Sequence, residues 1–350
     1  MKSADGVHPA FAPLLTQAQN NAARVVLPEG EDPRIVAAAV RACADGIAQP
    51  VLLGNTAQVQ QLMLAAQDEI AAADSATTAQ AKTPLPEIID PAAYPQRQQL
   101  IDALVEWRGH KGMDAAKADK TLEDSLTLAA MLLATDTVAG CVAGAVYPTA
   151  DVVRTALQLI GKRDGFSFAS SFFLMLMTQP HHPRQDAMLF ADCALNVDPD
   201  AEQLAEIAVQ TGESAKQLLS IEPEIAMLSF STNGSARHPK IEKVRSATAS
   251  ARERRPDWRI IGDVQLDAAM IPDILAAKAP EMATDAPANI LVFPDLDSGN
   301  IGYKLCERFG GCEAIGPVLQ GLAKPVNDLS RGCKTEDIYK ILAVTSVQAG

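Results

Sequence analysis

The sequence has few aromatic residues: they make up 4% of its 350 residues, whereas hydrophobic residues as a whole make up 48%. The interior must therefore be built mainly from Ala, Leu, Ile, Val and Met. Such a composition suits helices packed on a parallel sheet. The chain is also longer than one ordinary domain, which favours two domains.

The chain lacks the excess of basic residues that nucleic-acid-binding proteins usually carry. Its 30 Lys and Arg residues are outnumbered by 43 Asp and Glu residues, and the formal net charge is −13. We therefore predict no nucleic-acid partner. A small anionic substrate remains compatible with this charge, because a few arginines that converge on one site matter more locally than the net charge does.

Long apolar runs and paired cysteines are also missing. The longest apolar stretch, residues 125–146, is interrupted by threonines, an aspartate and glycines, so it predicts a buried helix and strand and no membrane span. The N-terminus shows no apolar signal-peptide core. The six cysteines show neither CxxC pairs nor the spacing of metal ligands, which predicts reduced thiols in a cytoplasmic protein without a metal.

Short buried strands alternate with helices along the chain, which predicts an α/β fold with a parallel sheet. Asp32 and Pro33 are expected to begin a helix at residues 34–45. Strands are predicted at residues 24–27, 49–53, 137–145, 187–191, 225–230, 260–263 and 290–293. Ser170 and Ser171 either line a binding site or cap an apolar helix. The polar connector at residues 161–165 is bounded by glycines and predicts a domain break near residues 162–166.

Polar clusters follow several predicted strands, and ligands of open α/β sheets bind beyond the carboxyl ends of the strands. Three of these clusters are Tyr147 to Arg154, Ser231 to Ser235 and Asp295 to Asn300. Each alone is weak evidence, because Gly, Ser and Asn are common in any loop. Their repetition at strand ends favours one shared site.

The most informative cluster lies in a predicted loop near the C-terminus and comprises Lys324, Asn327, Asp328, Ser330 and Arg331. Arginine offers a planar fork of donors to an anion, and serine adds a short hydroxyl. Taken without further information, the loop could equally be a polar surface turn before a helix.

Single residues allow ordinary interpretations as well. A carboxylate such as Asp337 is favoured in the first turn of any helix. Arg108 and Arg154 lie on predicted helices and could simply be surface charges.

Residues 316–337 resemble the C-terminal signature of phosphate acetyltransferases. Further motifs of that family occur in the same order along nearly the whole chain, at residues 25–34, 142–154, 170–175, 190–196, 228–236 and 293–304. The first twenty residues and residues 58–94 resemble the family poorly.

This resemblance implies two three-layer α/β domains with a cleft between them, similar to the isocitrate/isopropylmalate dehydrogenase-like fold. It also implies a discontinuous first domain. We predict that residues 1–164 and 320–350 form this domain and that residues 165–319 form the second. The resemblance further implies a homodimer.

The activity implied by the resemblance is the reversible transfer of an acetyl group between coenzyme A and inorganic phosphate. Ser330, Arg331 and Asp337 match the positions that carry the family's chemistry, and Arg108 and Arg154 match its anion-binding arginines. We predict further substrate contacts at Thr149, Asn300 and Lys304. Coenzyme A would be a substrate, and no tightly bound cofactor is expected.

The expected mechanism is direct transfer in a ternary complex, with Asp337 taking the proton of the coenzyme A thiol. Burial would raise the pKa of this carboxylate, and a nearby arginine would lower it. An acetyl-enzyme intermediate on Cys333 or Cys193 is the mechanistic alternative, although neither thiol has an adjacent base in the sequence.

Three other functions stay open on the sequence alone. The chain could transfer butyryl groups, or it could be a catalytically inactive regulatory domain. It could also be a metal-dependent decarboxylating dehydrogenase. The last would need a carboxylate cluster, which Asp263, Asp267, Asp295 and Asp297 could imitate, and a nucleotide-binding loop, for which the sequence shows no convincing GxGxxG motif.

Overall fold

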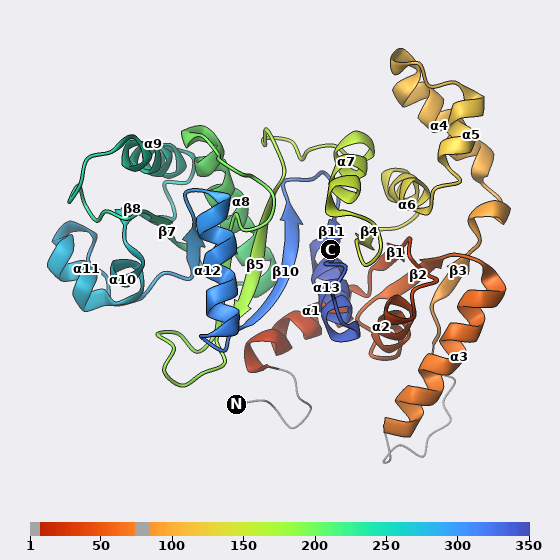
Figure 1. Ribbon diagram of the computed structural model, residues 1–350, viewed down its shortest axis with the longest axis horizontal. Coiled ribbons are helices and arrows are strands. Elements are labelled where there is room, and N and C mark those ends of the chain that lie inside the picture. Colours follow the sequence, from red (N-terminus) through yellow and green to blue (C-terminus); the bar gives the residue numbers. More distant parts are fainter. Residues whose placement is uncertain (1–7, 74–83) are drawn as a thin grey trace. The chain divides into compact units, whose positions relative to one another are not determined.

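The computed structural model describes residues 8–73 and 84–350, and these form two compact units (Figure 1). The five-strand unit comprises Leu15–Arg163 and Leu322–Gly350, and the six-strand unit comprises Asp164–Gly321 together with the described residues up to Leu14. Unlike the predicted first domain, the five-strand unit excludes these first residues, because His8 lies beside Met177 and Glu313 of the six-strand unit. That the two units are separate domains stays a prediction.

The sheet of the five-strand unit is parallel throughout. Its order is β11 (Val326–Asp328), β4 (Gly140–Ala143), β1 (Arg24–Leu27), β2 (Gln49–Leu53) and β3 (Glu87–Ile89). The predicted bounds of β1 and β2 are confirmed. Strands β3 and β11 were not predicted, because each has only three residues and β11 contains Asn327 and Asp328. The prediction of these two residues in a loop is wrong: they lie in β11 and are at most 1% exposed.

Helices cover both faces of this sheet. Helix α2 (Pro33–Ala44) packs against α3 (Thr56–Ala73) and α13 (Thr335–Gln348), whereas α6 (Ser125–Ala134) and α7 (Thr149–Leu159) pack together on the opposite face (Figure 1). The Asp32 side chain accepts a hydrogen bond from the backbone N–H of Arg34, with Pro33 in the first turn, which confirms the predicted start of α2. The remaining α-helices in the described residues of this part of the chain are α1 (Ala12–Asn21), α4 (Arg97–Arg108) and α5 (Ala115–Thr121).

The sheet of the six-strand unit is mixed. Its order is β10 (Glu313–Gln320), β5 (Ser170–Leu176), β6 (Ala187–Ala191), β9 (Ile290–Val292), β7 (Glu224–Leu228) and β8 (Arg259–Val264). Strands β10, β5 and β6 pair antiparallel, so the expected parallel arrangement holds only from β6 to β8. Ser170 and Ser171 begin β5, which corrects the interpretation of this segment as a capped helix.

Helices flank the strands of this sheet in the chain. They are α8 (Ala201–Leu219), α9 (Pro239–Arg254), α10 (Leu266–Met270), α11 (Pro272–Lys278) and α12 (Leu296–Arg308). Met175 and Met177 are buried in the apolar cluster of this unit. Across the described ranges of both units, no helix has the length and hydrophobicity that a membrane crossing requires.

Candidate active site

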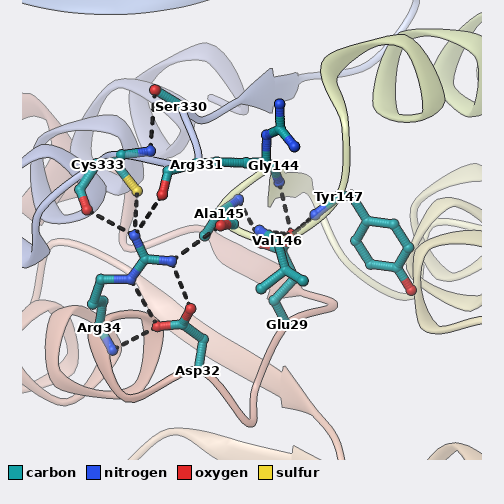
Figure 2. Close-up of polar contacts among 11 residues, drawn as sticks. Glu29, Asp32, Arg34, Gly144, Ala145, Val146, Tyr147, Ser330, Arg331 and Cys333 are labelled. Carbon is teal, nitrogen blue, oxygen red and sulfur yellow. Dashed lines mark hydrogen bonds and ion pairs between the residues drawn. The ribbon is translucent and has the colours of Figure 1, made fainter.

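Three neighbouring strands of the five-strand unit bring their carboxyl ends together. Strand β4 lies between β1 and β11, and its register pairs Cys141 with Val26 on one side and with Val326 on the other. Because all three strands are parallel, the segments that follow them leave the same edge of the sheet. Those segments begin at Pro28, Gly144 and Leu329, and Figure 2 shows the contacts among them.

Glu29 links the segment after β1 to the segment after β4. Its Oε1 accepts hydrogen bonds from the backbone N–H groups of Gly144, Val146 and Tyr147 at 3.1, 2.7 and 2.8 Å, and its Oε2 accepts one from Ala145 at 3.0 Å (Figure 2). The side chain is 6% exposed. Because hydrogen bonds to a carboxylate are stronger than neutral ones, Glu29 fixes the path of residues 144–147.

Arg34 links all three segments. Its Nη1 donates to the carbonyl oxygens of Arg331 and Cys333, both at 2.9 Å, and its Nη2 donates to the carbonyl oxygen of Ala145 at 3.0 Å. Asp32 holds the guanidinium from the other side at 2.7 Å. Burial pushes the pKa of Asp32 upward, but its hydrogen bonds from Arg34 outweigh burial and hold this pKa below its usual range.

The segment after β11 presents two of the predicted catalytic residues at the surface. Ser330 and Arg331 are both exposed, while Cys333 behind them is buried. The turn is closed by the backbone N–H of Cys333, which donates to the carbonyl oxygen of Ser330 at 2.9 Å, and by Gly332, whose N–H donates to Ser330 Oγ at 3.3 Å. A guanidinium and a hydroxyl on a fixed turn can together bind a phosphate or a carbonyl oxygen.

The carboxyl group of Asp328, the last residue of β11, is buried and lies two residues before Ser330 in the chain. Asp328 Oδ2 accepts a hydrogen bond from Thr149 Oγ1 at 2.6 Å, whereas Oδ1 is buried without a hydrogen-bond partner among the described residues. Burial raises the pKa of Asp328 to about 6, and the negative charge of Glu29 adds to this effect, while the Thr149 hydrogen bond opposes it. Asp328 therefore ties the start of α7 to the segment that carries Ser330.

Asp337 occupies the first turn of α13, where it accepts a hydrogen bond from the backbone N–H of Lys334 at 2.8 Å. Its side chain is exposed, so the expectation that this carboxylate is buried is wrong. Ser330, Arg331 and Asp337 thus lie within eight consecutive residues, the first two in the turn after β11 and the third in the first turn of α13.

Of the two predicted anion-binding arginines, Arg154 lies on α7 and Arg108 contacts the same helix. Arg154 lies on α7, is exposed and pairs with Asp151 at 2.6 Å. Arg108 ends α4 and its Nη1 donates to the carbonyl oxygen of Gln158, near the end of α7, at 3.2 Å. Thr149 begins this helix. The three residues therefore share contacts with one helix, and only Thr149 is shown in contact with the segment after β11.

Several known proteins similar in sequence to this chain are named phosphate acetyltransferase. The sequence profile of the family described as "Phosphate acetyl/butaryl transferase" matches residues 10–346. The chain belongs to this family. It is 42% identical to a phosphate acetyltransferase of Paracoccus denitrificans, over 99% of both chains, and 42% identical to one of Thermoanaerobacterium thermosaccharolyticum, over 96% of this chain and 98% of that one.

Two solved structures share the fold of this chain, and the first is also similar to it in sequence. A crystal structure of a phosphotransacetylase from Streptococcus pyogenes superposes with a TM-score of 0.86 at 43% identity, covering 97% of this chain and 98% of that one. A branched-chain phosphotransacylase from Enterococcus faecalis superposes with a TM-score of 0.64 at 20% identity, over 93% of this chain and 99% of that one. The chain is thus a member of a family of acyltransferases with a fold built from two α/β parts.

Two of the predicted substrate-binding residues belong to the six-strand unit. Asn300 and Lys304 lie one turn apart on α12, and the Lys304 ammonium donates to the Asn300 side-chain oxygen. The Asn300 amide in turn donates to the carbonyl oxygen of Cys193 at 3.0 Å. Their position relative to the Ser330 turn stays a prediction.

The thiols of Cys333 and Cys193 are poorly suited to form an acetyl-enzyme intermediate, because both are buried. Burial raises the pKa of Cys333 to about 11, although Arg34 counteracts the shift, and burial raises the pKa of Cys193 well above its ordinary value. A nucleophilic cysteine needs the opposite shift and some exposure. Direct transfer therefore remains the mechanism that the residues favour.

Three of the four carboxylates that could imitate a dehydrogenase metal site, Asp263, Asp267 and Asp295, have other partners. Asp263 binds Arg245 at 3.1 Å, and Asp267 binds Lys278 at 2.7 Å. Asp295 caps the start of α12. Within residues 8–73 and 84–350, no group of three or more His, Cys, Asp or Glu side chains could hold a metal ion.

Sequence reasoning missed Glu29 and Arg34 as parts of the site, and it placed Asp328 in a loop. A signal for Glu29 was present, because it lies two residues after the end of a predicted strand, just as Tyr147 does. Arg34 gave no such signal, since an arginine in the first turn of a helix reads as a surface charge. Its role depends on three carbonyl acceptors, of which two lie almost three hundred residues away in the sequence.

Proposed function

We propose that this protein is a phosphate acetyltransferase that interconverts acetyl-CoA plus phosphate with acetyl phosphate plus coenzyme A. Support comes from a family relationship over residues 10–346 and from one structural observation. That observation is the turn after β11, which exposes Ser330 and Arg331 while Arg34 anchors its backbone carbonyls from behind. The acyl group passes between the two substrates in a ternary complex, without a tightly bound cofactor.

In the proposed mechanism, Arg331 binds the phosphate group through two parallel N–H donors. The Ser330 hydroxyl donates a hydrogen bond to the acetyl carbonyl oxygen as this oxygen becomes negative in the transition state. A single donor of this kind stabilises the transition state of acyl transfer by roughly 3 kcal/mol. Both contributions require a turn with a fixed backbone, which the two 2.9 Å hydrogen bonds from Arg34 supply.

Asp337 acts as the general base in the direction of acetyl phosphate consumption. A free thiol is only a few per cent ionised at neutral pH, so removal of its proton during the attack accelerates the reaction by roughly 10²- to 10⁴-fold. The exposed carboxylate in the first turn of α13 is accessible to an incoming thiol. In the reverse direction, the resulting carboxylic acid returns the proton to the leaving thiolate.

The other predicted residues bind the substrates. Arg108, Arg154 and Thr149, which all contact or lie on α7, would attract the anionic groups of coenzyme A or phosphate. Asn300 and Lys304 would form a second anion-binding subsite on α12. The protein would act as a homodimer in the cytoplasm, in keeping with its free cysteines.

The decisive experiment follows the release of coenzyme A from acetyl-CoA with a thiol reagent, with and without inorganic phosphate. We expect release that depends on phosphate in the unmodified protein and at least a 100-fold loss in Arg331→Ala. Arg254→Ala is the matched control, because Arg254 is also exposed but lies at the end of α9 and pairs with Glu202. It should retain the activity within about twofold.

Absence of phosphate-dependent release would contradict the proposed activity. The measurement is then repeated with butyryl-CoA. Release from butyryl-CoA alone would assign the protein to the other acyl group named in the family description. Binding of acetyl-CoA without turnover of either thioester would identify an inactive, ligand-binding domain.

A further inference from the structure

Two cysteine side chains of the six-strand unit lie in direct contact. Cys306 belongs to the last turn of α12, and Cys312 directly precedes β10. The Cys312 thiol donates a hydrogen bond to Cys306 Sγ, and the two sulfur atoms are 3.5 Å apart. Both thiols are reduced in this structure.

The backbone around these cysteines already has the proximity that a disulfide needs. The backbone N–H of Cys312 donates to the carbonyl oxygen of Cys306 at 3.2 Å. A backbone hydrogen bond of this length places the two Cα atoms roughly within the 4.4–6.8 Å range of disulfides. Gly310 and Gly311 form the turn between them, and Gly311 has a φ of +71° that most side chains would disfavour. Side-chain rotation can then bring the two sulfur atoms closer than their present 3.5 Å.

The two thiols differ in the way that a stepwise oxidation requires. The hydrogen bond from Cys312 lowers the pKa of Cys306, which favours its thiolate, the form that reacts with an oxidant. Cys306 is half-buried and therefore reachable from solvent, whereas Cys312 is buried and its pKa is raised by the same hydrogen bond and by desolvation. Cys306 is thus the thiol that an oxidant attacks first.

The surroundings of Cys312 hold it in place and supply no base. Met177 Sδ lies 3.5 Å from Cys312 Sγ, and His182 Nε2 lies 3.8 Å away. His182 Nε2 also lies 2.9 Å from the carbonyl oxygen of Gly310. Because a carbonyl oxygen can only accept, Nε2 carries the hydrogen and donates it there. His182 therefore fixes the Gly310–Gly311 turn, which keeps Cys312 facing Cys306.

We propose that Cys306 and Cys312 form an oxidative modification site, at which a hydroperoxide converts the two thiols into a disulfide. In the first step the Cys306 thiolate attacks one oxygen of hydrogen peroxide, the O–O bond breaks, and hydroxide leaves as Cys306 becomes a sulfenic acid. In the second step Cys312 attacks the Cys306 sulfur, the S–O bond breaks, and water leaves. Two thiols and one peroxide thus give one disulfide and two waters. A dithiol reductant reverses the modification by exchange.

Neither cysteine belongs to the residues assigned to the proposed acetyl transfer, and Cys306 shares helix α12 with Asn300 and Lys304. This site departs from the sequence-based expectation of six unpaired thiols. The spacing of five intervening residues carries no recognised pattern, and the contact arises only because the chain reverses direction at Gly310 and Gly311.

Trypsin offers a sharp test, because Arg308 lies between the two cysteines. Cleavage after Lys304, Arg308 and Arg331 places Cys306 in peptide 305–308 and Cys312 in peptide 309–331, since the Lys324–Pro325 bond resists trypsin. The protein is treated with a small excess of hydrogen peroxide, the remaining thiols are alkylated under denaturing conditions, and the digest is examined by mass spectrometry without reduction. We expect the two peptides to appear joined, with a mass two hydrogens below their sum, and to separate after dithiothreitol.

Three variants complete the test. Cys312→Ser should leave a sulfenic acid on Cys306 that a cyclic 1,3-diketone traps at least tenfold faster than any reaction at Cys43, a buried thiol whose pKa is raised. Cys306→Ser should abolish the joined peptides, and Cys43→Ala should form them as the unmodified protein does. Absence of joined peptides in the unmodified protein, or equal trapping at Cys306 and Cys43, would overturn the proposal.

Discussion

Glu29 and Asp192 are two buried carboxylates that follow β1 and β6, one in each unit, and both accept hydrogen bonds from consecutive backbone N–H groups. Glu29 binds residues 144–147, more than a hundred positions further along the chain. Asp192 binds the N–H groups of Ala194, Leu195 and Asn196 at 3.0 to 3.1 Å, all within its own segment. It also accepts from Ser171 on the neighbouring β5.

This difference shows how two sheets with similar edges can hold their loops in different ways. In the five-strand unit, the segments after separate strands are bonded to one another through Glu29 and Arg34. In the six-strand unit, the segment after β6 is closed mainly upon itself. We therefore expect a substitution at Glu29 to disturb two loops at once, and a substitution at Asp192 to disturb mainly one.

The largest effect is expected from Glu29→Gln, which preserves size but replaces one acceptor oxygen with an amide donor. At least one of the four N–H groups then faces another donor, and a buried donor without a partner costs roughly 1–3 kcal/mol. Together with the loss of charge-assisted hydrogen bonds, we expect about 3–4 kcal/mol less stability toward urea.

Asp192→Asn is the matched substitution in the other unit. It should cost about 1–2 kcal/mol, because its short segment can relax locally. An equal loss for both variants would remove the distinction between the two edges.

Asp328→Asn sharpens the comparison through its pH dependence. The folded state raises the pKa of Asp328 from 3.8 to about 6, so it favours the neutral carboxyl group. Folding stability is therefore lost as the pH rises from about 4 to about 6, and a shift of two units corresponds to roughly 3 kcal/mol. Asn cannot ionise, so the stability of the variant relative to the unmodified protein should increase over this interval.

Urea unfolding of both proteins at pH 4, 5, 6 and 7 measures this difference. If the difference in free energy of unfolding between the two proteins stays constant from pH 4 to pH 7, the predicted upward shift of the Asp328 pKa is contradicted. The comparable position in the other unit is Asp263, a buried carboxyl group bound to Arg245.

Arg34→Lys tests whether the turn after β11 needs its anchor. Lysine keeps the charge but cannot donate to Asp32 and three carbonyl oxygens in one plane. A loosened turn misplaces Ser330 and Arg331, and we expect kcat for coenzyme A release to fall about 10- to 100-fold. Arg184→Lys is the control, since Arg184 also donates to a carboxylate and to a carbonyl oxygen but lies in the segment before β6. A similar loss in both variants would assign the effect to general destabilisation.

The smallest effect is expected from Thr149→Val, which removes the hydroxyl donor to Asp328 without changing the shape of the side chain. The loss should be about 1 kcal/mol at pH 7, the usual net value of one hydrogen bond, and smaller at pH 4. Thr149→Ser should retain most of the stability. A serine variant as unstable as the valine variant would show that the methyl group, and not the hydroxyl, matters.

Sequence patterns predicted the strands with continuous apolar runs, such as β1 and β2, and the capped start of α2, because burial and capping are local properties. They failed where tertiary contacts decide. Strand β11 is short and polar, and Asn327 is buried there because its amide bonds Thr345 and Gln348 of α13. The antiparallel pairing of β10 with β5 likewise left no trace in the local pattern.

The candidate site divides in the same way. Ser330, Arg331 and Asp337 could be named from a motif because they lie within eight residues of sequence. Glu29 and Arg34 act through backbone groups of distant segments, and backbone acceptors and donors have no sequence identity that a pattern could reveal.

Hydrogen–deuterium exchange of Glu29→Gln, followed at the amides of residues 144–147, tests most directly whether separate segments are bonded together at this edge. We expect exchange at these amides to accelerate at least tenfold, with a smaller acceleration at residues 331–333. In Asp192→Asn, acceleration should be confined to residues 192–196 and their neighbours on β5. Unchanged exchange at residues 144–147 in Glu29→Gln would contradict the account.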